Sequence, residues 1–367
     1  AVCLASPLRD VYKRQVFSSA SHGYDTLDYF TIDPRLGDDD DFDHLLQAAH
    51  ARGLSVLLDG VFNHVSRRNR IVQDAQSAGP DSDAGRMVRW CAGRLDVFEG
   101  HSDLVALNHD NPAVREHVTR IMNYWCGRGV DGWRLDAAYS VNPEFWAAVL
   151  PSVREKYPDV WIFGEVIHGD YASIVRASGM DSVTQYELWK GIWSSIESRN
   201  FFELDHALGR HNEFSDAFTP MTFVGNHDVT RIASRVGQDG AVLATAILAT
   251  IGGIPLIYYG DELAYRGVKE ERFGGDDDIR PVFPASPADL SNLGADTLRA
   301  HQSLLGLRRR HPWLVDARTE SLDLTNERYV YRTGVPGVEP LIVELDVRDG
   351  CSVLIREAGQ VVWSSGA

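Results

Sequence analysis

Cysteine is scarce in this sequence, and long apolar runs are absent. The chain of 367 residues has four cysteines, and none of the short Cys–Cys or Cys–His spacings that build zinc or redox sites. No uninterrupted apolar stretch of about 20 residues occurs, so we expect no membrane partner. The start of the chain, 1–15, lacks the long apolar run and small-residue cleavage site of a secretory signal, which favours a cytoplasmic location.

Positively charged residues are also few compared with negatively charged ones. The chain has 36 Lys and Arg residues against 52 Asp and Glu residues, giving a net charge of −16. Nucleic-acid binding needs clustered lysine and arginine that replace the counterions of the phosphate backbone. We therefore expect no nucleic-acid partner, whereas a neutral or cationic ligand is compatible with this charge.

The apolar content is that of a folded protein. A hydrophobic share of 44% with 24% charged residues is ordinary for a globular chain with a sizeable core. The length suits one α/β barrel of about 250 residues with a small appendage.

From Gly53 onward, short β-rich apolar runs alternate with helical patterns, which is typical of repeated βα units and a parallel sheet. The expected strands are 54–62, 130–136, 160–166, 182–186, 221–226 and 254–259. The expected helices are 41–52, 112–127, 143–157, 171–178, 241–251 and 295–310. Asn111 and Asn142 each precede a proline, a combination that begins helices.

Two segments depart from this rhythm. The polar, glycine-rich segment 66–110 is too long for an ordinary loop and predicts a small inserted domain. Alternating stretches after residue 311 predict a C-terminal antiparallel β domain, 312–367. The predicted catalytic barrel thus comprises 16–65 and 111–311.

Polar residues follow the expected strands at their carboxyl ends, where barrel enzymes place their active sites. They are Asp59, Asn63, His64, Arg134, Asp136, Glu165, His227 and Asp228. Any one of them alone is more often a loop cap, an ion-pair partner or a packing residue. Their joint occurrence on several strands favours an active site.

These residues lie in motifs that resemble the α-amylase family, glycoside hydrolase family 13. DGVFNH (59–64), GWRLDAA (132–138), GEV (164–166) and FVGNHD (223–228) resemble the four sequence regions of the family, in order. GGIPLIYYGDEL (252–263) resembles its eighth barrel strand, and HGYDTLDYFTIDPRLG (22–37) resembles the segment after its second strand. The likeness covers 22–311 and implies a (β/α)8 TIM barrel.

The resemblance implies roles for individual residues. Asp136 would attack the anomeric carbon, Glu165 would protonate the departing oxygen, and Asp228 would stabilise the transition state, while Arg134 holds Asp136 ionised. The other implied sugar contacts are hydrogen bonds from His64 and His227, stacking by Tyr24 with His22 beside it, and contacts of Asp277 and Arg280 with the next sugar toward the non-reducing end. Such a retaining reaction needs two carboxyl groups about 5 to 5.5 Å apart.

One departure from the family concerns the leaving-group side. A Lys–His pair often follows the nucleophile motif there and contacts both the sugar and, through a backbone carbonyl, a calcium ion. Tyr139 and Ser140 occupy those positions here. Asn63 still matches a calcium ligand of the family, but we expect no required cofactor and no metal site, with calcium as the less favoured alternative. The change favours short oligosaccharides over long polymers.

The second departure is at the N-terminus. In the family a strand, a helix and a second strand precede the His22–Tyr24 segment, whereas only 16–21 could belong to them here. The resemblance therefore predicts that two barrel strands are missing, that 1–15 is a non-native segment, and that the chain is truncated at its N-terminus.

The sequence thus predicts a retaining glycosidase that cleaves α-glucosidic bonds in maltooligosaccharides or related small α-glucosides. A transglycosylase or isomerase of the same family is the first alternative, because a sugar hydroxyl can replace water. An inactive relative that only binds carbohydrate is an alternative from another class. A metal-dependent barrel hydrolase using His64 and His227 is poorer, because no His-x-x-x-His pattern supports it. Oligomeric state and linkage preference are not predicted.

Overall fold

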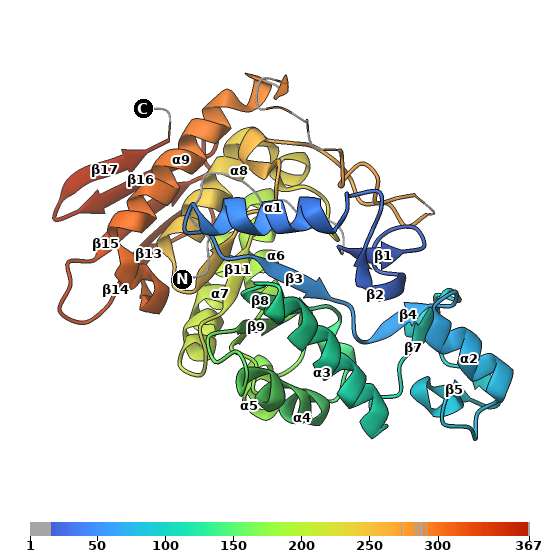
Figure 1. Cartoon of the computed structure of the whole chain (residues 1–367). Coiled ribbons are helices and arrows are strands. Elements are labelled where there is room, and N and C mark those ends of the chain that lie inside the picture. The colour runs from blue at the N-terminus through green and yellow to red at the C-terminus, as the bar shows by residue number, and fades with distance from the viewer. Residues whose placement is uncertain are drawn as a thin grey trace. The chain divides into compact units, whose positions relative to one another are not determined.

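The computed structural model describes residues 16–272, 274–282, 284, 286, 289–290 and 292–365 (Figure 1). The described residues divide into two compact units, 16–183 and 184–365. The segment 1–15, which we expect to be non-native, lies outside the described residues. The boundary between the units falls inside the predicted catalytic barrel. The predicted limits of the barrel, the inserted domain and the C-terminal β domain therefore stay a prediction.

A parallel sheet organises the first unit. Its strands follow the order β10 (Ser182–Val183), β9 (Trp161–Gly164), β8 (Gly132–Leu135) and β3 (Leu57–Gly60). The register pairs Asp59 with Arg134, and Leu135 with Gly164. Because Leu135 and Gly164 are the last residues of adjacent parallel strands, Asp136 and Glu165 follow at the same edge of the sheet. The four strands expected in this part of the chain are confirmed, each shorter than expected.

Helices precede and connect these strands. They are α1 (Asp39–His50), α2 (Arg70–Ala78), α3 (Pro112–Gly127), α4 (Pro143–Arg154) and α5 (Tyr171–Ser178). The side chain of Asn111 accepts a hydrogen bond from the backbone N–H of Ala113, with Pro112 in the first turn, which explains why α3 begins as predicted. The fully buried rings of Phe17, Phe62, Trp125, Trp133 and Trp146 form the centre of this unit's core.

Short antiparallel pairs complete the first unit. They are β1 (Phe17–Ser19) with β2 (Thr26–Ile32), β4 (His64–Ser66) with β7 (Leu104–Ala106), and β5 (Trp90–Cys91) with β6 (Arg94–Leu95). The segment predicted as an inserted domain contains α2, β5, β6, β7 and two short 3-10 turns, η1 (Gly85–Met87) and η2 (Phe98–Gly100).

The second unit begins with another parallel pair, β11 (Met221–Phe223) and β12 (Ile254–Leu256), and Thr184 bridges to Met221 in the same sense. Its helices are α6 (Tyr186–Glu197), α7 (Phe201–Ser215), α8 (Ile232–Thr250) and α9 (Ala295–Arg310). The predicted strand 182–186 is wrong at its end, because Gln185 caps α6 and the helix begins at Tyr186. The predicted helix 241–251 is part of the longer α8, which bends at Gly237.

A five-stranded antiparallel sheet forms the C-terminal part of the second unit and confirms the predicted β module. Its strands follow in chain order: β13 (Arg318–Leu324), β14 (Arg328–Gly334), β15 (Leu341–Asp346), β16 (Ser352–Glu357) and β17 (Gln360–Ser364). One apolar face of this sheet joins α7 and α8 in a single hydrophobic core, in which the hydroxyls of Thr250 and Tyr331 lie 2.6 Å apart.

The architecture is therefore α/β with an added antiparallel sheet. Closure of the parallel strands into a barrel stays a prediction. None of the helices in the described part of the chain combines the length and apolar character that crossing a bilayer requires.

Candidate active site

A cluster of three carboxylates surrounds one guanidinium in the first unit. We call Asp59, Arg134, Asp136 and Glu165 the carboxylate cluster. One terminal nitrogen of Arg134, Nη1, lies 2.6 Å from both carboxylate oxygens of Asp59 and 3.1 Å from Oδ1 of Asp136. The other, Nη2, lies 2.7 Å from Oε1 of Glu165. A single side chain therefore contacts both the predicted nucleophile and the predicted acid.

The backbone explains why these groups meet. The N–H of Asp136 donates to the carbonyl of Gly60 at 3.1 Å, and the N–H of Glu165 donates to that of Leu135 at 2.8 Å, so both continue the sheet's hydrogen bonding. Ala137 then adopts a left-handed conformation with φ of 45°. This turn lets the N–H of Ala137 donate to Oε2 of Glu165 at 3.1 Å. Such strain in a residue with a side chain costs about 1–3 kcal/mol and is often found at functional sites.

Burial strengthens the electrostatics of the carboxylate cluster. Asp136 is 7% exposed and Glu165 is 6% exposed. Burial by itself lowers the pKa of Arg134, but the carboxylates of Asp59, Glu165 and Asp136 outweigh it and hold that pKa well above its ordinary value. Burial raises the pKa of Asp59, and Arg134 opposes this rise. The guanidinium is thus a permanent cation in a poorly solvated site.

Two residues of the His22–Tyr24 segment lie beside this cluster. The buried Tyr24 donates its hydroxyl to Oδ2 of Asp59 at 2.9 Å, and its ring centre is 6.0 Å from the guanidinium carbon of Arg134. His22 is exposed, and its Nδ1 accepts from the backbone N–H of Tyr24 at 3.2 Å. The structure therefore brings Tyr24 into contact with the carboxylate cluster and places His22 next to it at the surface.

His64 is buried just after Asn63. Its Nε2 lies 3.1 Å from the carbonyl oxygen of Tyr24, and its Nδ1 lies 3.2 Å from the amide nitrogen of Asn63. Burial lowers the pKa of His64 to about 4. Both ring nitrogens already have protein partners, so a sugar hydroxyl would have to share or replace one of them.

The remaining predicted site residues belong to the second unit. Oδ2 of Asp228 lies 3.0 Å from Nε2 of His227, and its Oδ1 lies 2.8 Å from Nη2 of Arg280. Arg280 also donates to the carbonyl of His227 at 2.9 Å, which fixes the carboxylate from two sides. The residue of the 276–280 turn that pairs with Arg280 is Asp276, at 2.8 Å, whereas Asp277 is exposed.

Comparison with known proteins decides the family. The description "Alpha amylase, catalytic domain" matches residues 6–96 and 94–317. The chain belongs to the α-amylase family. The first matched range includes residues 6–15. That the segment 1–15 is non-native stays a prediction.

Relatives within the α-amylase family extend beyond this chain. "Alpha-amylase 3" of Dictyoglomus thermophilum is 32% identical over 289 residues, covering 70% of this chain and 57% of that protein. "Intracellular maltogenic amylase" of Bacillus subtilis is 32% identical over 276 residues, covering 70% and 46%. The crystal structure of the α-amylase from H. orenii matches with a TM-score of 0.77 and 26% identity, covering 90% of this chain and 78% of that one. The chain spans about half the length of the curated relatives.

The calcium ligand expected from the α-amylase family is only partly retained. Oδ1 of Asn63 is buried and makes no hydrogen bond within the described residues. Calcium takes about six to eight oxygen ligands, carboxylates among them. Among the residues that the structure describes, no three histidine, cysteine, aspartate or glutamate side chains gather into a group that could hold a metal ion. Asn63 is therefore an isolated side-chain match to that site.

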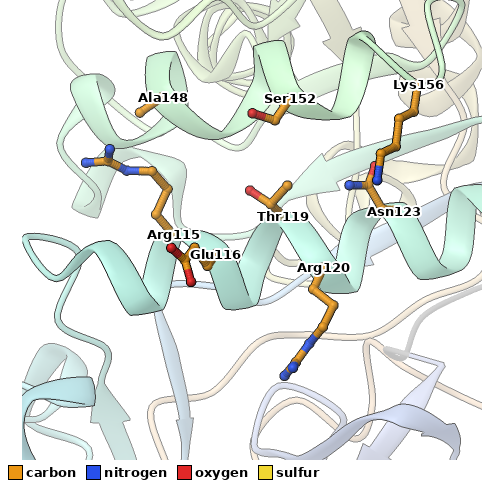
Figure 2. Close-up of a pocket in the computed structure, with 8 residues that line it drawn as sticks. All are labelled: Arg115, Glu116, Thr119, Arg120, Asn123, Ala148, Ser152 and Lys156. Carbon is orange, nitrogen blue, oxygen red and sulfur yellow. The ribbon is translucent and has the colours of Figure 1, made fainter. Parts of the chain in front are cut away.

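A surface groove lies apart from these motifs, between α3 and α4 (Figure 2). It has a volume of about 370 Å³, and its charged lining consists of Arg115, Arg120, Lys156 and Glu116. A retaining glycosidase of the α-amylase family needs two carboxyl groups on one sugar bond. With one carboxylate and none of the predicted site residues, this groove is not the candidate active site.

Sequence reasoning missed two contributors to the site. The sequence places Asp59 in a predicted strand without indicating a role, yet Asp59 contacts both Arg134 and Tyr24. Glu99 had no signal at all, because it is an isolated acid in the polar segment 66–110. Its carboxylate accepts a hydrogen bond from Tyr139, the residue that departs from the α-amylase family pattern.

Proposed function

We propose that this member of the α-amylase family is a retaining glycosidase that cleaves α-glucosidic bonds in maltooligosaccharides or related small α-glucosides. The observation that carries the proposal is the shared contact of Arg134 with Asp136 and Glu165, at 3.1 and 2.7 Å. Two carboxyl groups bound to the ends of one guanidinium are near enough to act on opposite sides of one glycosidic bond.

In the proposed reaction, a carboxylate oxygen of Asp136 attacks the anomeric carbon while Glu165 gives its proton to the departing oxygen. The covalent glycosyl-enzyme is then hydrolysed by a water molecule, whose proton returns to Glu165. Arg134 keeps Asp136 ionised as a nucleophile, because a buried cation beside a carboxylate favours its charged form.

The other roles follow the family resemblance. Asp228 would grip sugar hydroxyls and stabilise the positive charge of the transition state. The remaining proposed sugar contacts are made by His22, Tyr24, His64, His227, Asp277 and Arg280. We also propose that the chain adopts the (β/α)8 barrel fold that the family resemblance implies.

The choice of small substrates is supported by two features. Tyr139 and Ser140 replace the Lys–His pair on the leaving-group side. A relative with 32% identity is named a maltogenic amylase, and its name also calls it intracellular, which supports a cytoplasmic location here. The proposed partner is therefore an α-glucan oligosaccharide in the cytoplasm.

We propose further that the reaction needs no metal ion, because the proton transfers and the nucleophile are all assigned to protein carboxyl groups. Activity on maltotriose after dialysis against EDTA should equal the activity before it, and added calcium should not increase it. A loss that calcium restores would refute this part of the proposal.

The test of the proposed function uses Asp136→Asn and Glu165→Gln, with Asp74→Asn in an exposed surface pair as the matched control. Asp136→Asn should lower the kcat for maltotriose and for α-glucosyl fluoride by more than about a thousandfold, because both substrates need the nucleophile. Glu165→Gln should lower kcat/KM for maltotriose by about a hundred- to ten-thousandfold. It should lower kcat/KM for the fluoride much less, because fluoride leaves with little help from an acid when the glycosyl-enzyme forms.

Unchanged maltotriose hydrolysis by folded variants would refute the site assignment. Wild-type protein that binds maltotriose without cleaving it would identify a carbohydrate-binding protein instead. Products longer than maltotriose would identify a transglycosylase, because a second sugar would then have intercepted the glycosyl-enzyme.

A further inference from the structure

The turn η2 of segment 66–110 holds a charged residue in a strained conformation. Glu99 has φ of 48° and ψ of 32°, in the left-handed region that favours glycine. A residue with a side chain loses about 1–2 kcal/mol there. The strained turn is therefore maintained by its surroundings.

Contacts on both sides of Glu99 fix this turn. The Phe98 ring stacks on the His64 imidazole, with ring centres 4.6 Å apart and planes 14° from parallel. The N–H of His101 donates to the carbonyl of Phe98 at 2.9 Å and closes the turn. Because His64 is the last residue of the DGVFNH motif that also contains Asp59, η2 packs directly against a motif of the carboxylate cluster.

Tyr139 links Glu99 to the backbone of the proposed acid, Glu165. The Tyr139 hydroxyl donates to Oε1 of Glu99 at 2.7 Å, and the Tyr139 backbone N–H donates to the Glu165 carbonyl at 3.3 Å. The Tyr139 ring is half-buried, and its centre lies 5.6 Å from that of His168. Burial and the carboxylates of Glu99 and Glu165 raise the pKa of Tyr139, so its hydroxyl remains a donor at all ordinary pH values.

This pair offers unused hydrogen-bonding capacity. A carboxylate accepts through both oxygens, and Oε2 of Glu99 makes no hydrogen bond within the part of the chain that the structure describes. Glu99 is itself exposed, so that oxygen can be reached by a ligand. A fixed carboxylate beside an aromatic ring suits a sugar, which presents hydroxyl donors and apolar C–H faces.

We propose that Glu99, held by Tyr139, is a specificity-determining residue that accepts a hydrogen bond from a hydroxyl of the leaving sugar. This inference rests on the proposed function, because Glu165 marks the leaving-group side only if it is the proton donor. Glu99 would then supply, from the segment 66–110, a sugar contact in place of the Lys–His pair.

The test compares two substrates that differ in the leaving group. Maltotriose releases a sugar, whereas α-glucosyl fluoride releases fluoride and cannot use a leaving-sugar contact. Glu99→Gly should lower kcat/KM for maltotriose by about ten- to a hundredfold, the effect of removing a hydrogen bond to a charged group, and change the value for α-glucosyl fluoride less than about twofold. Because glycine suits the left-handed turn, the variant should be at least as stable as the wild type.

Two further variants separate this role from folding. Ala92→Gly changes another left-handed residue of the same segment, with φ of 49°, and should leave both substrates unaffected. Tyr139→Phe should lower maltotriose turnover selectively but less than Glu99→Gly, and the double variant should lose no more than Glu99→Gly alone, since both changes disrupt one contact.

An equal loss on both substrates, or no loss on either, would overturn the inference for Glu99. Failure of the proposed function gives a different result, since wild-type protein would then leave α-glucosyl fluoride intact. The two outcomes are therefore distinguishable in one set of assays.

Discussion

Arg134 is the residue on which the candidate site depends most. Its planar guanidinium contacts three carboxylates at once, which the compact ammonium of a lysine could not reproduce in the same geometry. Three acidic groups around one cation repel one another, and this repulsion favours a proton on one of them. A site that needs one ionised and one protonated carboxyl group benefits from this imbalance of charge.

Asp59→Asn tests the position of Arg134 at the residue scale. The change removes the ion pair of Asp59 with Arg134, while the amide can still accept from Tyr24. Arg134 is then held less firmly beside Asp136 and Glu165. We therefore expect kcat/KM for maltotriose to fall, with Asp74→Asn as the control that leaves it unchanged.

An unchanged kcat/KM in folded Asp59→Asn protein would contradict this role for Asp59 in positioning Arg134.

The carboxylate cluster was largely predictable at this scale, because strand ends carry Arg134, Asp136 and Glu165 in recognisable motifs. The links made by Asp59, Glu99 and Tyr139 were not, since each depends on which side chains face one another after folding. A single acid in a polar segment has no periodicity or motif that identifies its partner.

At the scale of the elements, the buried side chain of Arg231 holds the loop that follows β12. Arg231 has no exposed side-chain surface and donates to the carbonyls of Tyr259 and Ile279 and to the carboxylate of Asp261 at 2.9 Å. Its guanidinium also lies over the Tyr258 ring, 4.2 Å from the ring centre. Since Ile279 precedes Arg280, this side chain also positions the turn that holds Asp228.

Arg231→Met should therefore destabilise this part of the second unit. Removing one partner of a buried ion pair costs about 3–5 kcal/mol, and amide hydrogen exchange should accelerate in 258–272 and 274–282. The matched control Arg299→Met changes an arginine that is 70% exposed and should have little effect. Equal exchange rates in Arg231→Met and the wild type would show that Arg231 does not hold this loop.

End signals in the sequence account for only part of the helix prediction. The predicted bounds of α3, α5 and α9 agree with the structure, and a capping Asn or Asp precedes the first two. The helices α6 and α7 were not predicted, although the Asn200 side chain caps α7. Both are rich in aromatic residues, which have only a moderate preference for helices. The strand β13 was missed because most of its residues are exposed, so no alternation of apolar residues identifies it.

At the scale of the whole molecule, buried and half-buried histidines link stability to pH. Burial lowers the pKa of four of them to about 4 each: His64, His117, His211 and His301. The ordinary value is about 6.5, so between pH 6.5 and 4 the unfolded chain binds protons that the folded chain does not. The contribution of these neutral histidines to the free energy of unfolding is therefore fully present above pH 6.5. It is lost as the pH falls toward 4.

We expect the urea midpoint of unfolding to fall steeply from pH 7 to pH 5. Each such histidine adds at most about 1.4 kcal/mol per pH unit to the slope. His301→Gln should make the slope shallower, whereas exchange of the exposed His206 for Gln should leave it unchanged. A midpoint that is constant or rises on acidification would contradict this account.

The measurement that tests the central claim most directly is capture of the covalent intermediate. A 5-fluoro-α-glucosyl fluoride forms a glycosyl-enzyme that hydrolyses slowly, because the ring fluorine destabilises the positively charged transition state. Intact mass and peptide mapping should find one added fluoroglucosyl group on the peptide that contains Asp136, and none in Asp136→Asn. Protein that turns over maltotriose but carries no adduct, or carries it on another carboxylate, would contradict the account.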